Sequence, residues 1–468
     1  MLPDNVLLEI FDFYGNTRHL SRIQWWHVLS HVCRRWRQII FESPHRLNLQ
    51  ILCTHRPPVR KNLGIWPAFP IVINYHNSWS GITPNEEDNI IAALEYPGRV
   101  SFFKLHMLGI RGSQVTNIVT VMLKPFPVLT HLNISAWLGN VPVLPAEFLG
   151  GSARRLKEIT LSGVPYPALP KLLLSASDLV KLDLFDIPPT GYISPKAMVA
   201  SLATLPRLKT LIIGFQSATS RPDRIPQPPI KRTLLPALIY FRFKGASEYL
   251  EDLVAQIDGP HLNQIVVAYL NQVVDFQVGQ FSKYIDRTVG PEIALFKHAQ
   301  FTFSHGSVAF IMYPHAGHSP WDRRPATTII SCEGTDWQVS HIAQVLSHLS
   351  AKLSHVVHLK LKVEPEGCGL NSTDDVEWLY LLHQFSTVRT LHVSQELAEH
   401  VALALEDVTA DSEMVYEVLP SLDLICVVGQ PASCVDKFSA ARRLSGHPVT
   451  VIDTEAEFNE NLESYVSE

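Results

Sequence analysis

Cysteine is sparse in this 468-residue sequence, and its distribution excludes a disulfide framework. The six cysteines are scattered along the chain, at Cys33, Cys53, Cys332, Cys368, Cys426 and Cys434. Because they form no close pair, they are expected to be reduced thiols. No apolar run reaches the roughly 18–20 residues that span a bilayer. The first residues carry Asp4 and Glu9, where a secretory signal is basic. These absences predict an intracellular protein of the cytoplasm or nucleus.

The sequence also lacks an excess of positive charge. Its 39 Lys and Arg residues face 44 Asp and Glu residues, which gives a net charge of −5. Such a balance provides no broad electrostatic footprint, so we expect neither a nucleic acid nor a membrane as partner. Six of the acids gather in residues 453–468, which contain no Lys or Arg and are expected to form a solvated acidic tail.

Motifs of enzyme active sites are missing. The chain contains no Gly-x-Ser-x-Gly elbow, phosphate loop, dinucleotide fingerprint or His-Glu-x-x-His pair. Its 21 histidines are densest at His315 with His318, and at His341, His348, His355 and His358. A zinc site needs closely spaced ligands from two short elements, and these histidines have no acidic or Cys partner placed beside them. We therefore expect no catalysis, no cofactor and no metal.

A repeat organises most of the chain. The apolar pattern φ-x-x-φ-x-φ appears in VLTHLNI (128–134), RLKEITL (155–161), DLVKLDL (178–184), RLKTLII (207–213), ALIYFRF (237–243), HLNQIVV (261–267), HVVHLKL (355–361), TVRTLHV (387–393) and SLDLICV (421–427). Weaker copies are RVSFFKL (99–105) and KHAQFTF (297–303). Alternate residues of a strand share a face, so each copy predicts a strand with one buried side.

Helical patterns separate these predicted strands. Thr83, Pro84 and Glu86 form a capping box ahead of one helix, and Ser194 with Pro195 starts another. Strand, loop and helix recurring every two dozen or more residues are typical of a leucine-rich-repeat solenoid, with a parallel concave sheet and outer helices. A doubly wound α/β sheet is the alternative, but its strands share no internal repeat. The Asn or Cys that usually follows each strand is absent, so we expect an irregular solenoid.

The opening segment is a separate small unit. Leu7, Ile10, Phe11 and Tyr14 form one helical apolar stripe, and Trp25, Val28, Leu29, Val32 and Trp36 repeat that spacing. LPDNVLLEIFDFY followed by HVCRRWRQII resembles the F-box, a three-helix motif with a Leu-Pro start and a Val-x-Arg-x-Trp core. The predicted organisation is an N-terminal three-helix F-box-like unit at 1–45, a solenoid at 46–452 with a Pro-rich insertion at 217–236, and the tail at 453–468.

The resemblance to F-box/leucine-rich-repeat proteins, in particular to their divergent fungal members, implies a role as substrate receptor of an SCF-type ubiquitin ligase. It implies a Skp adaptor as partner and, through the adaptor, a cullin scaffold. Carried over by position, the implied adaptor contacts are Leu2, Pro3, Val6, Leu7, Ile10, Phe11, Val32, Cys33 and Trp36. The alternative is that several of these residues, above all Val32 and Trp36, only pack the unit and touch no adaptor. Truncation of a buried Trp36 is expected to cost about 3–5 kcal/mol.

An unknown target protein is expected on the concave strand face. Residues between the buried ones of each strand point there, and a mixed set of side chains is what a specific partner needs. The candidates are His131, Asn133, Lys181, Asp183, Tyr240, Arg242, Lys244, His358, Lys360 and Lys362. The insertion carries Arg221, Arg224, Lys231 and Arg232 and is either a connector or a further contact. The alternative function is an interaction scaffold whose opening unit only caps the repeats.

Overall fold

The chain divides into two compact units, each with its own run of neighbouring strands. The units are Met1–Ile212 and Ile213–Glu468, and strand β7 crosses their boundary. The computed structural model of the protein describes residues 2–17, 25–54, 59–75, 82–106, 112–136, 141–217, 232–270, 279–288, 296–304, 307–313, 327–333, 338–349, 353–364, 375–409, 418–428, 435–444 and 446–454.

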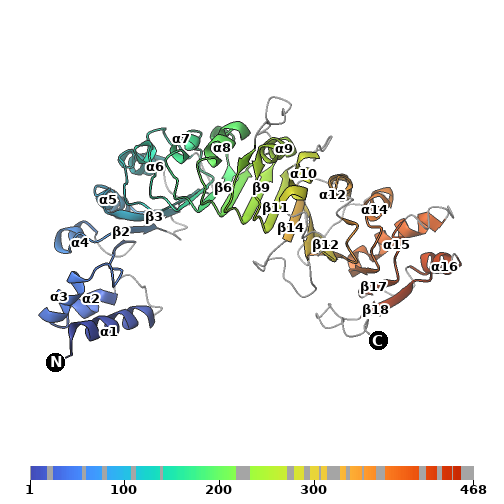
Figure 1. Ribbon diagram of the computed structural model, residues 1–468, viewed down its shortest axis with the longest axis horizontal. Coiled ribbons are helices and arrows are strands. Elements are labelled where there is room, and N and C mark those ends of the chain that lie inside the picture. The colour runs from blue at the N-terminus through green and yellow to red at the C-terminus, as the bar shows by residue number, and fades with distance from the viewer. Residues whose placement is uncertain are drawn as a thin grey trace. The chain divides into compact units, whose positions relative to one another are not determined.

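The first unit begins with three helices and continues as alternating strands and helices (Figure 1). The opening helices are α1 (Asp4–Thr17), α2 (Trp25–Ser30) and α3 (Arg34–Glu42). The strands are β1 (Ile51–Cys53), β2 (Ile71–Tyr75), β3 (Val100–His106), β4 (His131–Ser135), β5 (Glu158–Ser162), β6 (Lys181–Ile187) and β7 (Thr210–Phe215). The helices between them are α4 (Val59–Ile65), α5 (Pro84–Leu94), α6 (Gly112–Val121), α7 (Leu169–Leu173) and α8 (Pro195–Leu202), with short 3-10 turns at Phe148–Gly151 and Pro189–Gly191.

Strands β1 to β6 lie side by side in sequence order, and every pair is parallel. Leu132 of β4 lies opposite Ile159 of β5, which in turn lies opposite Leu182 of β6. All three side chains are buried, as the alternating pattern predicts. Helices α5 to α8 lie along one side of these strands (Figure 1). The predicted parallel sheet with outer helices is therefore confirmed in the first unit.

Local signals place the helices and turns of this unit. The Thr83 N–H and the Glu86 N–H each bond the other residue's side chain, at 2.7 and 3.3 Å, so the predicted capping box starts α5. The Ser194 hydroxyl caps α8 by accepting a bond from the Ala197 N–H. After β5 the chain turns at Gly163, which has a φ of 67° and a Cα so close to the Ala136 carbonyl that any Cβ would overlap its oxygen. Glycine alone fits such a turn.

The second unit has the same alternation over most of its length. Its strands are β8 (Thr233–Leu234), β9 (Tyr240–Gly245), β10 (Ile257–Asp258), β11 (Gln264–Leu270), β12 (His298–Ser304), β13 (Ser307–Tyr313), β14 (Thr327–Glu333), β15 (His358–Val363), β16 (Thr390–Val393), β17 (Leu424–Val428) and β18 (Thr450–Thr454). Its helices are α9 (Ser247–Gln256), α10 (Gly279–Thr288), α12 (Gln338–Ser347), α14 (Asp375–Leu382), α15 (Gln395–Thr409) and α16 (Asp436–Leu444).

One antiparallel strand interrupts the parallel sheet of the second unit. The strand order is β9-β11-β14-β13-β12-β15-β16-β17-β18, and β13 runs antiparallel to both of its neighbours. The expectation of parallel strands in sequence order is wrong at this point. Only two residues separate β12 from β13, and such a short link permits a hairpin but no parallel crossover.

The end of the array also differs from expectation. The sequence predicts that the unit SLDLICVVG (421–429), with the acidic tail, closes the last edge of the sheet, whereas a further strand, β18 from Thr450 to Thr454, pairs in parallel on the outer side of β17. This last strand reaches Thr454, two residues into the predicted acidic tail. Residues 455–468 lie outside the described residues. The boundaries drawn at 45 and 452 stay predictions.

Candidate partner-binding surfaces

The inside of the opening unit is built by two of the nine predicted adaptor contacts. Leu7 and Phe11, one helical turn apart on α1, are buried together with Ile39 and Ile40 of α3. Trp36 is half-buried, and its ring meets the edge of Phe11 with the centroids 4.9 Å apart. Leu7 and Phe11 therefore hold α1 against α3 in this structure. The sequence predicts a buried Trp36, and the structure shows a ring that is only half-buried.

A second apolar side of α1 faces outward. Leu2 is 52% exposed, and Val6, Ile10 and Phe13 are 37%, 45% and 71% exposed. Val6, Ile10 and Phe13 follow the i, i+4, i+7 spacing, so they share one helical face. We call Leu2, Val6, Ile10 and Phe13 the exposed α1 stripe. Phe13 was missed in the sequence, although the spacing from Val6 and Ile10 would have found it.

The break between α2 and α3 exposes two more predicted contacts. The spacing of Trp25 to Trp36 predicts one continuous stripe, but α2 ends at Ser30 and α3 begins at Arg34. Cys33 is the residue that caps α3, since its Sγ accepts a bond from the Trp36 N–H at 3.4 Å. Val32 is 56% exposed and Cys33 is exposed as well. The helix break thus turns both side chains outward.

Arg35 links the starts of α1 and α3. Its guanidinium donates to the Leu2 carbonyl at 2.6 Å and to the Asp4 carboxylate at 2.5 Å. Leu2 and Pro3, both exposed, are thereby tied to the first turn of α3, close in sequence to Val32 and Cys33. Six of the nine predicted contacts are therefore accessible: Leu2, Pro3, Val6, Ile10, Val32 and Cys33.

An aromatic cluster attaches the opening unit to the first strands. Trp26 of α2 is 1% exposed, and its ring lies 5.1 Å from Trp66 and 5.5 Å from Phe69, both beyond α4. The His27 ring is tilted by 36° against that of Trp66, with the centroids 4.6 Å apart. Burial, with a smaller contribution from His31, lowers the pKa of His27. A helix of the opening unit is thus packed into the beginning of the array.

The strand face of the first unit carries charges of both signs. His131, Asn133, Lys181 and Asp183 are half-buried, between the fully buried residues of β4 and β6. His131 lies 3.7 Å from the Glu158 carboxylate, and Lys181 lies 3.2 Å from Asp183. The predicted alternation holds at all four positions. On this face, cations and carboxylates neighbour each other.

The strand face of the second unit carries the remaining candidates. Tyr240, Arg242 and Lys244 are half-buried on β9, and His358, Lys360 and Lys362 are half-buried on β15. The His358 ring stacks on that of His298 in β12, with centroids 4.6 Å apart.

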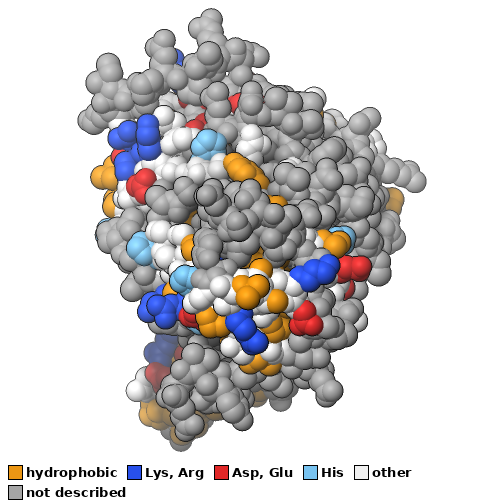
Figure 2. Space-filling view, turned by 90° about the vertical axis from the view of Figure 1, so that its right-hand side faces the viewer, with side chains coloured by type: hydrophobic (Ala, Val, Ile, Leu, Met, Phe, Trp, Pro, Cys, Tyr) orange, Lys and Arg blue, Asp and Glu red, His pale blue; other side chains and the backbone are white. Residues whose placement is uncertain are grey.

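Charges of both signs also appear where the molecule is viewed from its C-terminal strands. In Figure 2, Lys and Arg side chains form small groups among hydrophobic side chains, with Asp and Glu beside several of them. No broad field of one sign covers the described part of this face, which agrees with the net charge of −5.

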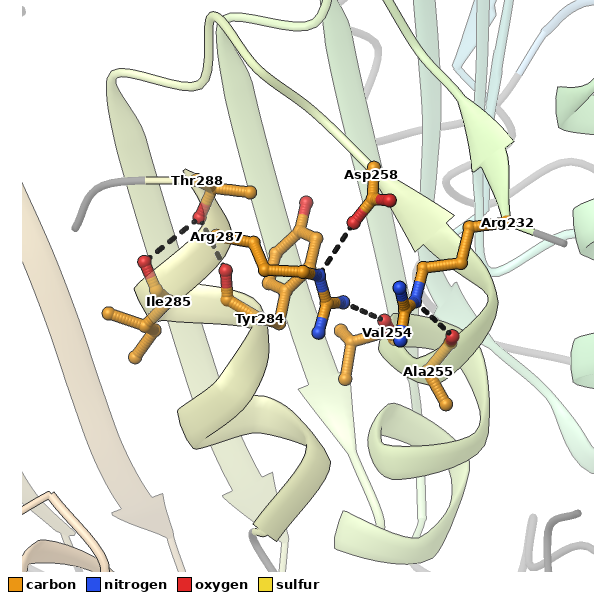
Figure 3. Close-up of polar contacts among 8 residues, drawn as sticks. All are labelled: Arg232, Val254, Ala255, Asp258, Tyr284, Ile285, Arg287 and Thr288. Atoms are coloured by element: carbon orange, nitrogen blue, oxygen red, sulfur yellow. Dashed lines mark hydrogen bonds and ion pairs between the residues drawn. The ribbon is translucent and has the colours of Figure 1, made fainter. Parts of the chain in front are cut away.

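The end of the predicted insertion joins a small sheet. Of its four cations, Arg221, Arg224 and Lys231 lie outside the described residues. Arg232 donates to the Ala255 carbonyl at 3.1 Å, beside the bond between Arg287 and Asp258 at 2.7 Å (Figure 3). The next residues form β8, which pairs with β10. The prolines of the insertion predict that it cannot join a sheet, and this prediction is wrong at this end, because Thr233 and Leu234 are not prolines and keep their backbone N–H groups.

Buried thiols and histidines provide no obvious reactive centre. Burial raises the pKa of Cys53 to about 12 and that of Cys426 to about 11, so these thiols stay protonated at neutral pH. Over the described residues, no group of three or more His, Cys, Asp or Glu side chains has the geometry to hold a metal ion. His315 and His318 lie outside that part of the chain. The structure likewise contains, within its described segments, no helix long and apolar enough to cross a membrane.

Comparison with known proteins identifies the opening unit. Residues 1–47 match the F-box-like family. A search of curated proteins found no match. Similar solved structures include the TLR13–ssRNA13 complex, at 12% identity and a TM-score of 0.32. The matched region covers 86% of this chain and 48% of the TLR13 chain. They also include the leucine-rich repeat-containing protein LegL7 from Legionella pneumophila, at 12% identity and a TM-score of 0.27. Here the matched region covers 86% of this chain and 99% of the LegL7 chain. The chain spans about half the length of the TLR13 chain. Because both TM-scores are low, the evidence for the repeat fold is the arrangement of strands and helices described above and not these two structures.

Proposed function

Because the chain joins an F-box-like segment to a leucine-rich-repeat array, we propose that it is the substrate-recognition subunit of an SCF-type ubiquitin ligase. In this role the opening unit binds a Skp adaptor, and the adaptor connects the chain to a cullin scaffold. The strand faces of the array bind the target protein. The chain itself acts by binding and catalyses no step.

The exposed α1 stripe is the observation that carries this proposal. Helix α1 has apolar side chains on two sides, and the buried side already packs on α3. The outward side, from Leu2 to Phe13, is exposed to solvent. Contiguous exposed apolar side chains mark a surface that a partner buries. The adjacent Val32 and Cys33 extend the same kind of surface towards α3.

The nine implied adaptor contacts then fall into two groups. Leu2, Pro3, Val6, Ile10, Val32 and Cys33 touch the adaptor directly, since all six are exposed. Leu7 and Phe11 position α1 from inside, and Trp36 supports them from the edge of Phe11.

The array is suited to a protein partner. Its half-buried strand residues combine amides, carboxylates, ammonium groups, imidazoles and the Tyr240 ring. Such variety discriminates between partners, because each mismatched charge or amide is left without its complement.

The second candidate function is an interaction scaffold whose opening unit only caps the first strands. The packing of Trp26 on Trp66 and Phe69 favours it, since a cap needs this contact and no adaptor. An exposed sheet edge at β1 would be a reason for such a cap.

Co-expression of the full chain with a Skp adaptor separates the two functions. A stable complex in size-exclusion chromatography is expected for the receptor. Elution of the folded chain without the adaptor would leave the interaction scaffold as the remaining candidate function. Repeating the experiment with Phe13→Asp tests whether the exposed α1 stripe is the contact, and retention of the adaptor by that variant would place the contact elsewhere.

A further inference from the structure

Three neighbouring strands of the second unit bring five basic side chains onto one face. His298 lies on β12, His358, Lys360 and Lys362 lie on β15, and His392 lies on β16. The register places His298 opposite His358 and Lys360 opposite His392. Because alternate residues of a strand share a face, these five residues form one surface, the basic strand face.

The floor of this surface is flat and aromatic. The rings of His298 and His358 stack with an angle of 12° between their planes. The ring of Tyr313 in β13 also stacks on that of His298, with the centroids 5.5 Å apart and an angle of 9° between the planes. Three nearly parallel rings thus lie next to the two lysines.

Acidic residues are missing from the same positions of these strands. The other residues that β12, β15 and β16 place on this face are Gln300, Thr302, Ser304 and Thr390. Tyr313 on β13 and the buried Cys426 on β17 are the neighbouring groups that can titrate, and the exposed Glu364 follows β15 at the rim. The strand face of the first unit differs, because its His131 and Lys181 lie beside Glu158 and Asp183.

The pKa of His392 reflects its burial and the positive charges around it. Burial, followed by smaller effects of the neighbouring Lys360, His358 and His298, lowers the pKa of His392 to about 4. Positive neighbours oppose a further positive charge, so an anionic ligand placed here relieves an existing repulsion.

We propose that the basic strand face binds an acidic segment, a run rich in Asp and Glu, of a partner protein. The proposal rests on the proposed function, since that partner would be the target of the ligase. An extended segment has carboxylates at alternate positions with the same spacing as Lys360 and Lys362. A nucleic acid fits less well, because it requires a longer track of cations than two lysines provide.

Proton binding should strengthen the complex. Carboxylates beside His298 and His358 favour the imidazolium form of both rings and raise their affinity for a proton. Binding must then tighten as the pH falls, by the same linkage. We expect the dissociation constant of an acidic peptide to fall about tenfold between about pH 7.5 and about pH 6.

Fluorescence anisotropy of the full chain with a labelled peptide of alternating Glu and Ser tests the proposal. Lys360→Gln with Lys362→Gln should raise the dissociation constant at least about tenfold. Lys181→Gln is the matched control on the strand face of the first unit and should leave binding unchanged. His298→Gln with His358→Gln should flatten the pH dependence. Circular dichroism of each variant shows whether it is folded.

Three results would overturn the proposal. The first is no binding by the wild type, or equal losses for Lys181→Gln and the Lys360/Lys362 variant. The second is tighter binding of single-stranded DNA of the same charge. The third is binding only after residues 455–468 are removed, which would make the acidic tail the occupant. The peptide assay needs no adaptor, so Phe13→Asp should retain peptide binding. Loss of adaptor binding alone would therefore refute the proposed function and leave this site standing.

Discussion

At the scale of single residues, the stability of the opening unit depends most on Trp26. Its indole is 1% exposed and contacts rings from α2, α3 and the segment after α4. Trp26→Ala is expected to lower the free energy of unfolding by about 3–5 kcal/mol. Trp36→Ala should cost clearly less, because Trp36 is only half-buried. Urea denaturation of both variants measures the difference, and an equal or greater loss for Trp36→Ala would contradict the packing described here.

A buried carboxylate predicts a pH-dependent stability in the second unit. Glu251 of α9 accepts the Gln280 and Phe281 N–H groups of α10 at 2.6 and 2.8 Å. Burial nevertheless raises its pKa to about 7, while these two bonds and Lys283 act in the opposite direction. The folded state therefore holds a proton between about pH 4.5 and 7 that the unfolded state has lost.

Folding stability from this group is present at low pH and is lost as the pH rises through about 7. Glu251→Gln cannot titrate and serves as the reference. The stability of the wild type relative to this variant should decline by up to roughly 3 kcal/mol between about pH 4.5 and 8. Chemical denaturation at several pH values measures the trend. A relative stability that is constant or rises with pH would show that the two N–H groups outweigh the burial of Glu251.

At the scale of elements, the turns after the strands decide whether neighbouring repeats can stack. Gly163→Ala adds a Cβ that overlaps the Ala136 carbonyl oxygen, at a φ of 67° that side chains disfavour. The variant is expected to lose more than about 2 kcal/mol of stability. Gly64→Ala is the matched control, since its Cβ would meet no atom within 4 Å and should be tolerated. Thermal denaturation of both variants compares them, and similar melting temperatures would refute the role of this turn.

Much of the element order could be predicted from the sequence because it depends on local patterns. The alternation of Leu132 and Ile134 with polar residues specifies a strand and its buried face. The Thr83 and Glu86 pair specifies the start of a helix. Strand β13 was missed because SVAFIMY lacks the repeat pattern, and its pairing depends on partners that are distant in sequence.

The opening unit shows the same limit for candidate sites. The spacing of its apolar residues predicts α1 correctly but does not tell which side is buried and which is exposed. Leu7 and Phe11 are buried only because α3 packs there, and the Arg35 bond to Asp4 spans 31 residues. The break at Cys33 depends on a weak sulfur cap that composition does not reveal. Tertiary packing therefore decides which of the residues predicted to touch the adaptor are buried and which are exposed.

At the scale of the whole molecule, the contact between the opening unit and the first strands would, in the proposed function, set how an adaptor is presented. Trp66→Ala removes the ring that joins Trp26, His27 and Phe41. The opening helices should then detach more often, and limited proteolysis should cut the segment between α3 and β2 faster than in the wild type. Leu174→Ala, at an exposed position of the array, is the control. Equal cleavage rates for Trp66→Ala and the wild type would mean that this cluster does not hold the unit.

The central claim is that the exposed α1 stripe binds a Skp adaptor while the array keeps its fold. Isothermal titration of a purified adaptor into the full chain, and into Val6→Asp with Ile10→Asp, tests it most directly. Both positions are exposed, so circular dichroism of the variant should match the wild type. We predict a saturable adaptor complex for the wild type and a loss of affinity of at least about 100-fold for the variant. No heat of binding with the wild type, or equal affinities for the two proteins, would contradict the account.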